Sequence, residues 1–305
     1  MYSFVLISNN AEIQYELAKH SITTQCIAAD CTVTALKNNH DTAYIVDFDS
    51  SETIVQYQSL IQEIVHANLP CIGISSKTQS VKKMLIQYGI IAVFRPSQYR
   101  YIPLFFKGYR PAVTGTIAIL DNDVCNTYGL KTVIQHFGYK AIVVDTLDAC
   151  CDIQNPVDMV CINCSQVSTH DIATKYVAGK LPKKNALVLY KSEERDIFIH
   201  DIIKLHRIAR VIYTLDEVYA LLVQLLFRQQ FHSLLYSLYE TSDMQRSVSA
   251  YKGSLRQLYL ETGVDIFMLP DITHSKSIDS FNEKTEMLQA VLAKAAAFSW
   301  LSDTE

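Results

Sequence analysis

The residues of this sequence that could take part in a reaction stand directly after short apolar runs. Asp47 follows AYIV, Ser75 follows CIGI, and Arg95 follows AVF. These groups suit phosphoryl chemistry, because a carboxylate can attack a phosphoryl group and a cation must neutralise its oxygens. Asn9 and Asn10 stand near the end of the first run, FVLI, and offer neutral amide oxygens. Because Mg²⁺ sites usually include one or two carboxylates, amides in this place predict weak Mg²⁺ binding.

The apolar runs indicate buried strands, because they are short and do not alternate with polar residues. Stretches with apolar residues at helical spacing separate them and supply the crossovers that parallel strands require. In the first third of the chain the runs cover residues 4–7, 25–28, 42–46, 70–74 and 90–94. We therefore expect a parallel five-stranded α/β sheet of order 2-1-3-4-5, with ligands bound beyond the carboxyl ends of its strands.

The same pattern occurs a second time. Residues 108–115, GYRPAVTG, are typical of a linker, and a new series of apolar runs begins at residue 116. Its runs end at Asp121, Asn163, Tyr190 and Thr214, which lie 112 to 119 residues after Asn9, Asp47, Ser75 and Arg95. This internal repeat predicts domains over residues 1–107 and 116–228, followed by a helical region over residues 229–305.

The first repeat resembles the receiver domain of response regulators. The segment AYIVDFDS is similar to the phospho-acceptor segment of that family, and YGIIAVFRP is similar to its last strand. The resemblance implies that Asp47 is the phospho-acceptor, that Ser75 is the switch hydroxyl, and that Arg95 replaces the usual lysine. It also implies that Asn9 and Asn10 replace the acidic pair that holds Mg²⁺. A helix cap is the alternative role for Asp47.

The second repeat departs from the family at other positions. Asp121 and Asp123 preserve an acidic cluster after the first strand and are the candidate metal ligands, with helix capping as their alternative role. At the acceptor position stands Asn163, an amide that cannot act as a nucleophile. Tyr190 takes the place of the switch hydroxyl, and Thr214 that of the lysine. The resemblance therefore implies a pseudo-receiver without phosphorylation.

The last part of the chain is predicted to be helical. Residues 216–241 carry a leucine-rich stripe, and further helices are expected over residues 244–260 and 281–300. Because exposed apolar stripes usually mark interfaces, we expect either that these helices cover the stripe or that a homodimer forms through them.

Composition excludes several classes of protein. A net charge of -4 without a basic cluster argues against nucleic-acid binding. The sequence has no apolar stretch long enough to span a membrane and no signal peptide, so we expect a cytoplasmic protein. The CxxC at residues 161–164 lacks a second pair for zinc, and neither common glycine-rich phosphate loop is present.

These observations predict a non-enzymatic bacterial two-component signalling or scaffold protein that acts through protein partners, including sensor kinases, without a cofactor. One alternative is a response regulator that is phosphorylated on Asp47 within a phosphorelay. Another is an enzyme or small-ligand binder on a flavodoxin-like fold, because fold alone does not fix function.

Overall fold

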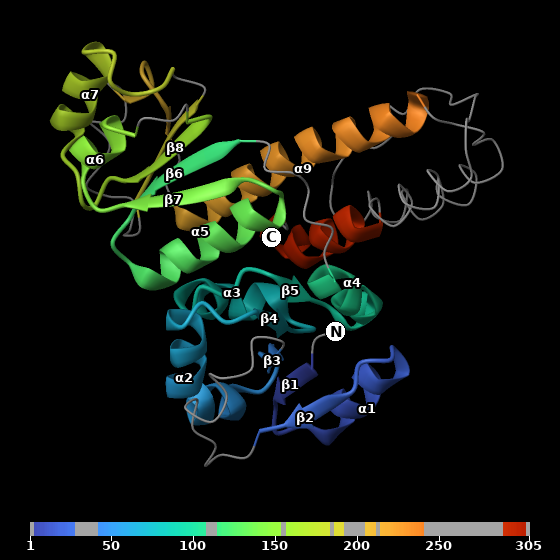
Figure 1. Cartoon of the computed structure of the whole chain (residues 1–305). Helices are drawn as coiled ribbons and strands as arrows, with labels where there is room; N and C mark the ends of the chain where they lie inside the picture. The colour runs from blue at the N-terminus through green and yellow to red at the C-terminus, as the bar shows by residue number, and fades with distance from the viewer. Residues whose placement is uncertain are drawn as a thin grey trace. The chain divides into compact units, whose positions relative to one another are not determined.

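The computed structural model contains two separate five-stranded sheets (Figure 1). It describes residues 3–27, 42–107, 115–153, 157–183, 186–191, 205–211, 214–240 and 289–302. All strand pairs in both sheets are parallel. The prediction of two doubly wound α/β sheets is therefore confirmed.

The first sheet has the strand order β2-β1-β3-β4-β5. Its strands are β1 (Ser3–Ile7), β2 (Thr24–Cys26), β3 (Thr42–Asp47), β4 (Cys71–Ile74) and β5 (Val93–Phe94). Every residue of the central strand β3 is buried, as expected for a strand covered on both faces. Its helical elements are α1 (Ala11–Lys19), α2 (Ser51–His66), α3 (Thr78–Gln87), the 3-10 helix η2 (Pro96–Tyr101) and α4 (Ile102–Lys107).

The second sheet has the order β10-β9-β8-β6-β7, which is again 2-1-3-4-5 when its strands are counted from β6. Its strands are β6 (Thr116–Leu120), β7 (Lys140–Val144), β8 (Met159–Asn163), β9 (Leu187–Tyr190) and β10 (Arg210–Val211). The helices between them are α5 (Val124–His136), α6 (Leu147–Cys151) and α7 (Thr169–Val177).

Glycine lies just beyond the ends of two of these helices. Gly89 after α3 has φ 69° and Gly138 after α5 has φ 83°. Both backbone conformations are in the left-handed region that favours glycine. The next residues, Ile90 and Tyr139, donate backbone hydrogen bonds back into the last turn.

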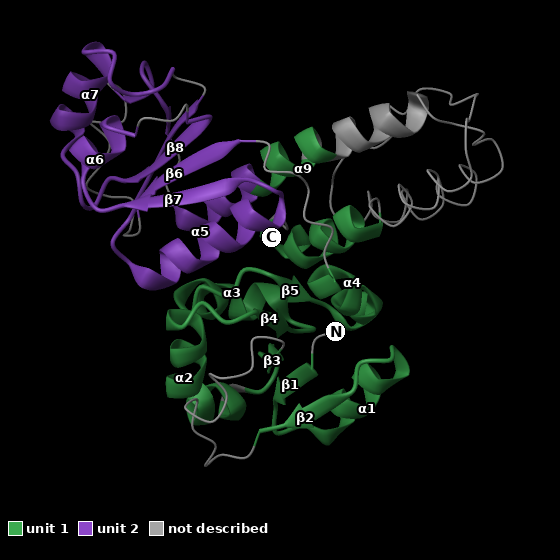
Figure 2. Cartoon of the chain, in the orientation of Figure 1, with its two compact units in different colours: residues 1–109, 223–305 green, residues 110–222 purple. Residues whose placement is uncertain are grey.

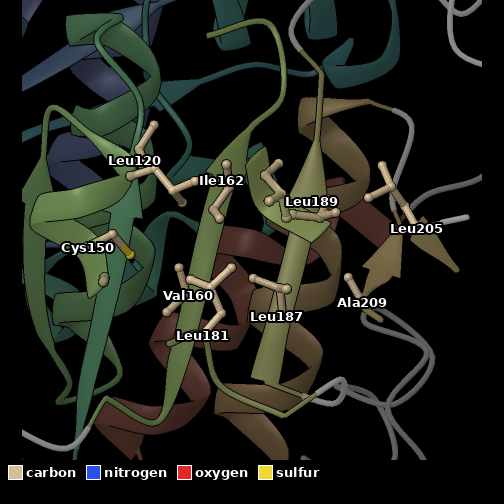
Figure 3. Packing of buried hydrophobic residues seen from close by; sticks show 12 residues of the cluster. Leu120, Cys150, Val160, Ile162, Leu181, Leu187, Leu189, Leu205 and Ala209 are labelled. Atoms are coloured by element: carbon tan, nitrogen blue, oxygen red, sulfur yellow. The ribbon is translucent and has the colours of Figure 1, made fainter. Parts of the chain in front are cut away.

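Alternate residues of the second sheet form one side of its core (Figure 3). Val160 and Ile162 of β8 lie beside Leu187 and Leu189 of β9, and all four are buried. Residues two apart in a strand face the same side of a sheet, so these strands supply two core residues each to this face.

The chain divides into two compact units (Figure 2). Residues 110–222 form one unit, whereas residues 1–109 and 223–305 form the other. Residues 223–305 are therefore grouped with the first sheet in one unit.

The long helix predicted over residues 216–241 is present as α9 (Leu215–Glu240). Leu222 and Leu226 of its stripe are buried, and the side chains beyond residue 230 lie outside the described residues. The helix predicted over residues 244–260 also lies outside them. Residues 289–298 form a helix that continues into η5 (Ser299–Ser302). Within the described part of the chain, we find no helix with the length and apolar character needed to span a membrane.

Candidate functional site

Asp47, the expected phospho-acceptor, is the last residue of β3 and is 1% exposed. Ser8 Oγ donates a hydrogen bond of 2.8 Å to Asp47 Oδ2, and the Asp49 backbone N–H donates one of 2.9 Å to Oδ1. Burial raises the pKa of Asp47, and the nearby Asp49 charge acts in the same direction, against these two hydrogen bonds. Asp47 is therefore a carboxyl group with a local donor on each oxygen.

The switch-position hydroxyl bonds to Asp49 rather than to Asp47. Ser75 Oγ donates to Asp49 Oδ1 at 2.7 Å, and the Ser76 backbone N–H lies 2.9 and 2.8 Å from the two Asp49 oxygens. Burial opposes ionisation of Asp49, but the hydrogen bonds from Ser76 and Ser75 outweigh it and lower its pKa. Asp49 thus fastens the loop after β3 to the loop after β4.

Arg95 lies at the start of η2, directly after β5. Its Nη2 is 3.4 Å from Thr78 Oγ1 at the start of α3, and its backbone N–H donates to Gln98 Oε1 at 3.0 Å. The strand-end position predicted for Arg95 is therefore correct, and its backbone is tied to the helical turn that follows.

The two asparagines expected near the metal position make other contacts. The Asn9 backbone N–H bonds to Thr53 Oγ1 at 3.2 Å, and its side-chain amide donates to Gln56 Oε1 at 3.0 Å, so Asn9 ties the loop to α2. Asn10 caps α1, because its Oδ1 accepts the Glu12 backbone N–H at 2.9 Å. Their side-chain contacts point to structural roles.

Strand register shows which loop residues correspond between the two sheets. Ile7 ends β1 and Leu120 ends β6, and each pairs with the second-last residue of the neighbouring third strand. The next residues, Ser8 and Asp121, are therefore equivalent. The expectation that Asn9 corresponds to Asp121 is wrong by one residue, because the apolar run alone does not reveal the pairing.

A second shift of one residue affects the switch position. Ile74 ends β4 and Tyr190 ends β9, and both pair with the last residue of the third strand. Ser75 therefore corresponds to Lys191, and Tyr190 is a buried strand residue instead of a replacement for the switch hydroxyl. Asp47 and Asn163, in contrast, are equivalent as the repeat predicts.

In the second domain, Asp121 is 1% exposed and lies at the centre of a dense network of neutral donors. Its Oδ2 accepts hydrogen bonds from Tyr190 Oη at 2.6 Å and from the side-chain amides of Asn126 and Asn163 at 3.1 Å each. Its Oδ1 accepts the Gln166 side-chain amide at 3.0 Å and the Asp123 backbone N–H at 2.9 Å. Five donors satisfy the carboxylate without a cation.

The tyrosines around this carboxylate are held in the protonated form. Burial raises the pKa of Tyr190, and the negative charge of Asp121 and the hydrogen bond to it raise the pKa further. Tyr219 of α9 donates from its hydroxyl to the Asn126 backbone oxygen at 3.2 Å, and burial raises its pKa as well. Both phenols thus remain donors and fix the network to β9 and α9.

The remaining candidate residues of the second domain act as helix caps. Asp123 Oδ1 accepts the Asn126 backbone N–H at 2.8 Å at the start of α5. Thr214 precedes α9, and its backbone N–H bonds to Glu217 Oε2 at 2.9 Å. No group of three or more His, Cys, Asp or Glu residues suited to a metal ion occurs among the described residues.

The two sites are reciprocal versions of one arrangement. In the first domain a hydroxyl at the end of β1, Ser8, donates to a carboxyl group at the end of β3, Asp47. In the second, an amide at the end of β8, Asn163, donates to a carboxylate after β6, Asp121. At this pair of positions each domain has one carboxyl group and one neutral donor, so there is no repulsion between two facing carboxylates for a metal ion to neutralise.

Comparisons with known proteins add little to this geometry. No family model matches the chain, and no curated protein is similar to it. A solved structure described as a probable two-component system response regulator/GGDEF domain protein is similar to 70% of this chain and 91% of its own, at 7% identity and a TM-score of 0.30. A similarity at this level carries no inference about function.

Proposed function

We propose that this chain is a non-enzymatic signal-transduction or scaffold protein whose two receiver-like domains act through protein–protein contacts. The observation that carries the proposal is the reciprocal exchange of Ser8–Asp47 for Asp121–Asn163. Phosphoryl transfer to a receiver needs a nucleophilic carboxylate and a metal ion together. The second domain lacks the nucleophile, and the first lacks the acid that would face it.

The absence of metal-dependent phosphorylation can be measured directly. The full chain is incubated with acetyl phosphate and Mg²⁺, and its intact mass is recorded. We expect no added phosphoryl group, and titration calorimetry should show no sub-millimolar Mg²⁺ affinity. Binding that is lost in Asp47→Asn or Asp121→Asn would contradict the proposal.

A second candidate function is phospho-acceptance by Asp47, because this carboxyl group stands at the end of β3 beside the hydroxyl of Ser8. In that case a sensor kinase or another two-component protein would be the partner. A single phosphoryl group that appears on wild type and not on Asp47→Asn would favour this function over the scaffold.

The other partner that we propose is a second copy of this chain, in a homodimer. Residues 290–301 are all buried within a single copy, so a dimer interface must use other parts of the chain. Light scattering at tens of micromolar distinguishes the states, and a monomer would remove the dimer from the proposal.

A further inference from the structure

Charge is distributed unevenly along the first domain, a feature that the net charge of -4 hides. Residues 64–120 contain seven lysines and arginines and not one aspartate or glutamate. Because the whole chain has 31 acidic residues in 305, a stretch of this length would be expected to contain about six. Residues 1–63 have the opposite character, with eight acidic and two basic residues. The basic residues are too widely spaced to form a basic run, but no acidic residue interrupts them.

The strand order of the first sheet converts this separation in sequence into a separation in space. The order is β2-β1-β3-β4-β5, so residues 1–63 supply three adjacent strands and later residues supply the other two. The same division places α1 and nearly all of α2 in the first part, and α3, η2 and α4 in the second. Figure 1 shows β2 and α1 at one end of this sheet and β5, α3 and α4 at the other. We call residues 1–63 the acidic half and residues 64–107 the basic half.

Charged side chains on both halves are exposed. In the acidic half they are Glu12, Glu16, Glu52 and Glu63, and in the basic half they are Lys77, Lys83, Arg100 and Lys107. Glu16 is paired with Lys19, whereas Lys83 and Lys107 make no ion pair with any described residue. Residues 289–302 contact the basic half through Trp300 and add no acidic residue to it. The basic half therefore presents lysines and arginines that residues of its own surface do not neutralise.

The charge of the whole chain favours one partner for the basic half. A long polyanion such as DNA would also meet the rest of the chain, which has 31 acidic and 20 basic residues outside residues 64–120 and would repel it. A second copy of this chain offers an acidic half of opposite sign instead. Opposite ends of the same domain would then meet in a head-to-tail contact, which is heterologous and can repeat from copy to copy.

We propose that this chain associates head to tail, with the basic half of one copy against the acidic half of the next. The inference rests on the proposed scaffold function and names a second copy as its partner. The exposed glutamates carry the contact, because Asp47 and Asp49 are held by hydrogen bonds within the strand-end site. Since exposed ion pairs each contribute little and are screened by salt, the contact needs several pairs at once and weakens as salt rises.

Light scattering of the full chain at low and high salt tests the role of charge. In about 20 mM NaCl and at tens of micromolar, the average mass should exceed that of a dimer and rise with concentration, as repeating contacts require. In about 500 mM NaCl it should fall to that of the monomer, because the ions screen exposed charges. A monomer at both salt concentrations overturns the proposal. A dimer that does not respond to salt also overturns it, but leaves the proposed homodimer standing.

Two variants with altered charge identify the two surfaces. Lys83→Glu/Lys107→Glu reverses charge in the basic half only, and Glu12→Gln/Glu52→Gln/Glu63→Gln removes charge from the acidic half only. Each variant alone should associate at least about tenfold more weakly than wild type at low salt. An equimolar mixture should form a one-to-one dimer and nothing larger, because one intact acidic half meets one intact basic half. A mixture that stays monomeric, or a single variant that associates like wild type, contradicts the proposal.

Lys140→Glu/Lys180→Glu is the matched control. It makes the same change in net charge on two exposed lysines of the second unit, so it should associate like wild type. If it abolishes association as strongly as Lys83→Glu/Lys107→Glu does, net charge decides the association and the proposal is wrong. A wild type that stays monomeric but binds a DNA duplex through Lys83 and Lys107 would show that the basic half serves a polyanion instead. These experiments do not depend on phosphorylation or Mg²⁺, so their failure is distinct from that of the proposed function.

Discussion

At the scale of single residues, the two sheets differ in which position carries the carboxyl group. Ser8 and Asn163 are neutral donors, and each bonds to the carboxyl group opposite it, Asp47 or Asp121. The apolar runs locate the loops, but strand register is needed to show that Ser8, and not Asn9, is equivalent to Asp121. That difference leads to a sharp test.

The variant Ser8→Asp should create a Mg²⁺ requirement in the first domain. The new carboxylate would lie close to Asp47, because Ser8 Oγ is 2.8 Å from Asp47 Oδ2. Two facing carboxylates repel, so the variant should be less stable than wild type in EDTA and regain stability when Mg²⁺ binds the folded state. Thermal denaturation with millimolar Mg²⁺ measures this.

Asn9→Asp is the matched control for this prediction. The Asn9 side chain bonds to Gln56 on α2, so an added charge there does not face Asp47. Asn9→Asp should therefore show no Mg²⁺-dependent change in its midpoint of thermal denaturation. A Mg²⁺ response in Asn9→Asp and none in Ser8→Asp would show that the register argument is wrong.

Tyr190→Phe should destabilise the second domain by about 1.5–3 kcal/mol, since it removes a hydrogen bond to a buried charged group. Its hydroxyl donates to Asp121 at 2.6 Å, whereas Tyr15 is 67% exposed. Tyr15→Phe should therefore be close to neutral. Chemical denaturation of both variants gives the comparison, and equal effects would mean that the Asp121 network contributes little.

At the scale of elements, the sequence predicts strands better than it predicts the contacts between loops. The presence of buried parallel strands follows from non-alternating apolar runs separated by helical stretches. The sequence does not mark Asn126, Gln166 and Tyr219 as site residues. The contacts of Asn126 and Gln166 with Asp121, and of Tyr219 with the Asn126 backbone oxygen, depend on how loops and helices pack. In the sequence, the usable sign of a site residue is its position as a polar residue at or directly after the end of a predicted strand.

The burial of the C-terminal helix, residues 289–298, is also not evident from the sequence. Its alanines offer little apolar area, yet residues 290–298 are all buried. Gln98, a polar residue after Pro96, gives no signal of its bond to Ser299, which is distant in the sequence.

Lys294→Met should stabilise the protein at neutral pH. The lysine pKa falls from 10.5 to about 8 on burial, which corresponds to about 3 kcal/mol at 1.36 kcal/mol per pKa unit. At pH 7 the lysine is charged in both states, so the folded protein bears the full penalty. Methionine has a similar shape and carries no charge, so the substitution removes the cost of burying the ammonium group. We expect a gain of about 1–3 kcal/mol in the free energy of unfolding.

Lys294 also gives the free energy of unfolding a pH dependence of defined sign. Between pH 8 and 10.5 the unfolded state binds more protons at Lys294 than the folded state, so wild-type stability should rise with pH in this window. Lys294→Met should lack that rise. The exposed Lys83, on α3, provides the control Lys83→Met, which should keep it. Urea titrations at several pH values decide the matter.

At the scale of the whole molecule, the two sheets depend differently on the ends of the chain. The second domain is continuous, over residues 110–222, and includes Tyr219, which bonds to Asn126. The first unit combines residues 1–109 with residues 223–305, and its C-terminal helix contacts Ile91, Gln98 and Phe105. The repeat in the sequence predicts two equivalent domains, but only one of them is complete as a single segment.

This asymmetry predicts opposite behaviour for two fragments. Residues 110–222 alone should fold cooperatively and remain monomeric. Residues 1–109 alone should bind a hydrophobic dye and aggregate, because removal of residues 289–302 uncovers Phe105 and the Ile91 carbonyl. Light scattering, dye fluorescence and urea unfolding of each fragment measure the difference. The full chain with Trp300→Ala is a milder variant, which should bind more dye than wild type while keeping both sheets. If residues 1–109 are monomeric, dye-silent and as stable as the full chain, the C-terminal helix is not part of the first domain's fold.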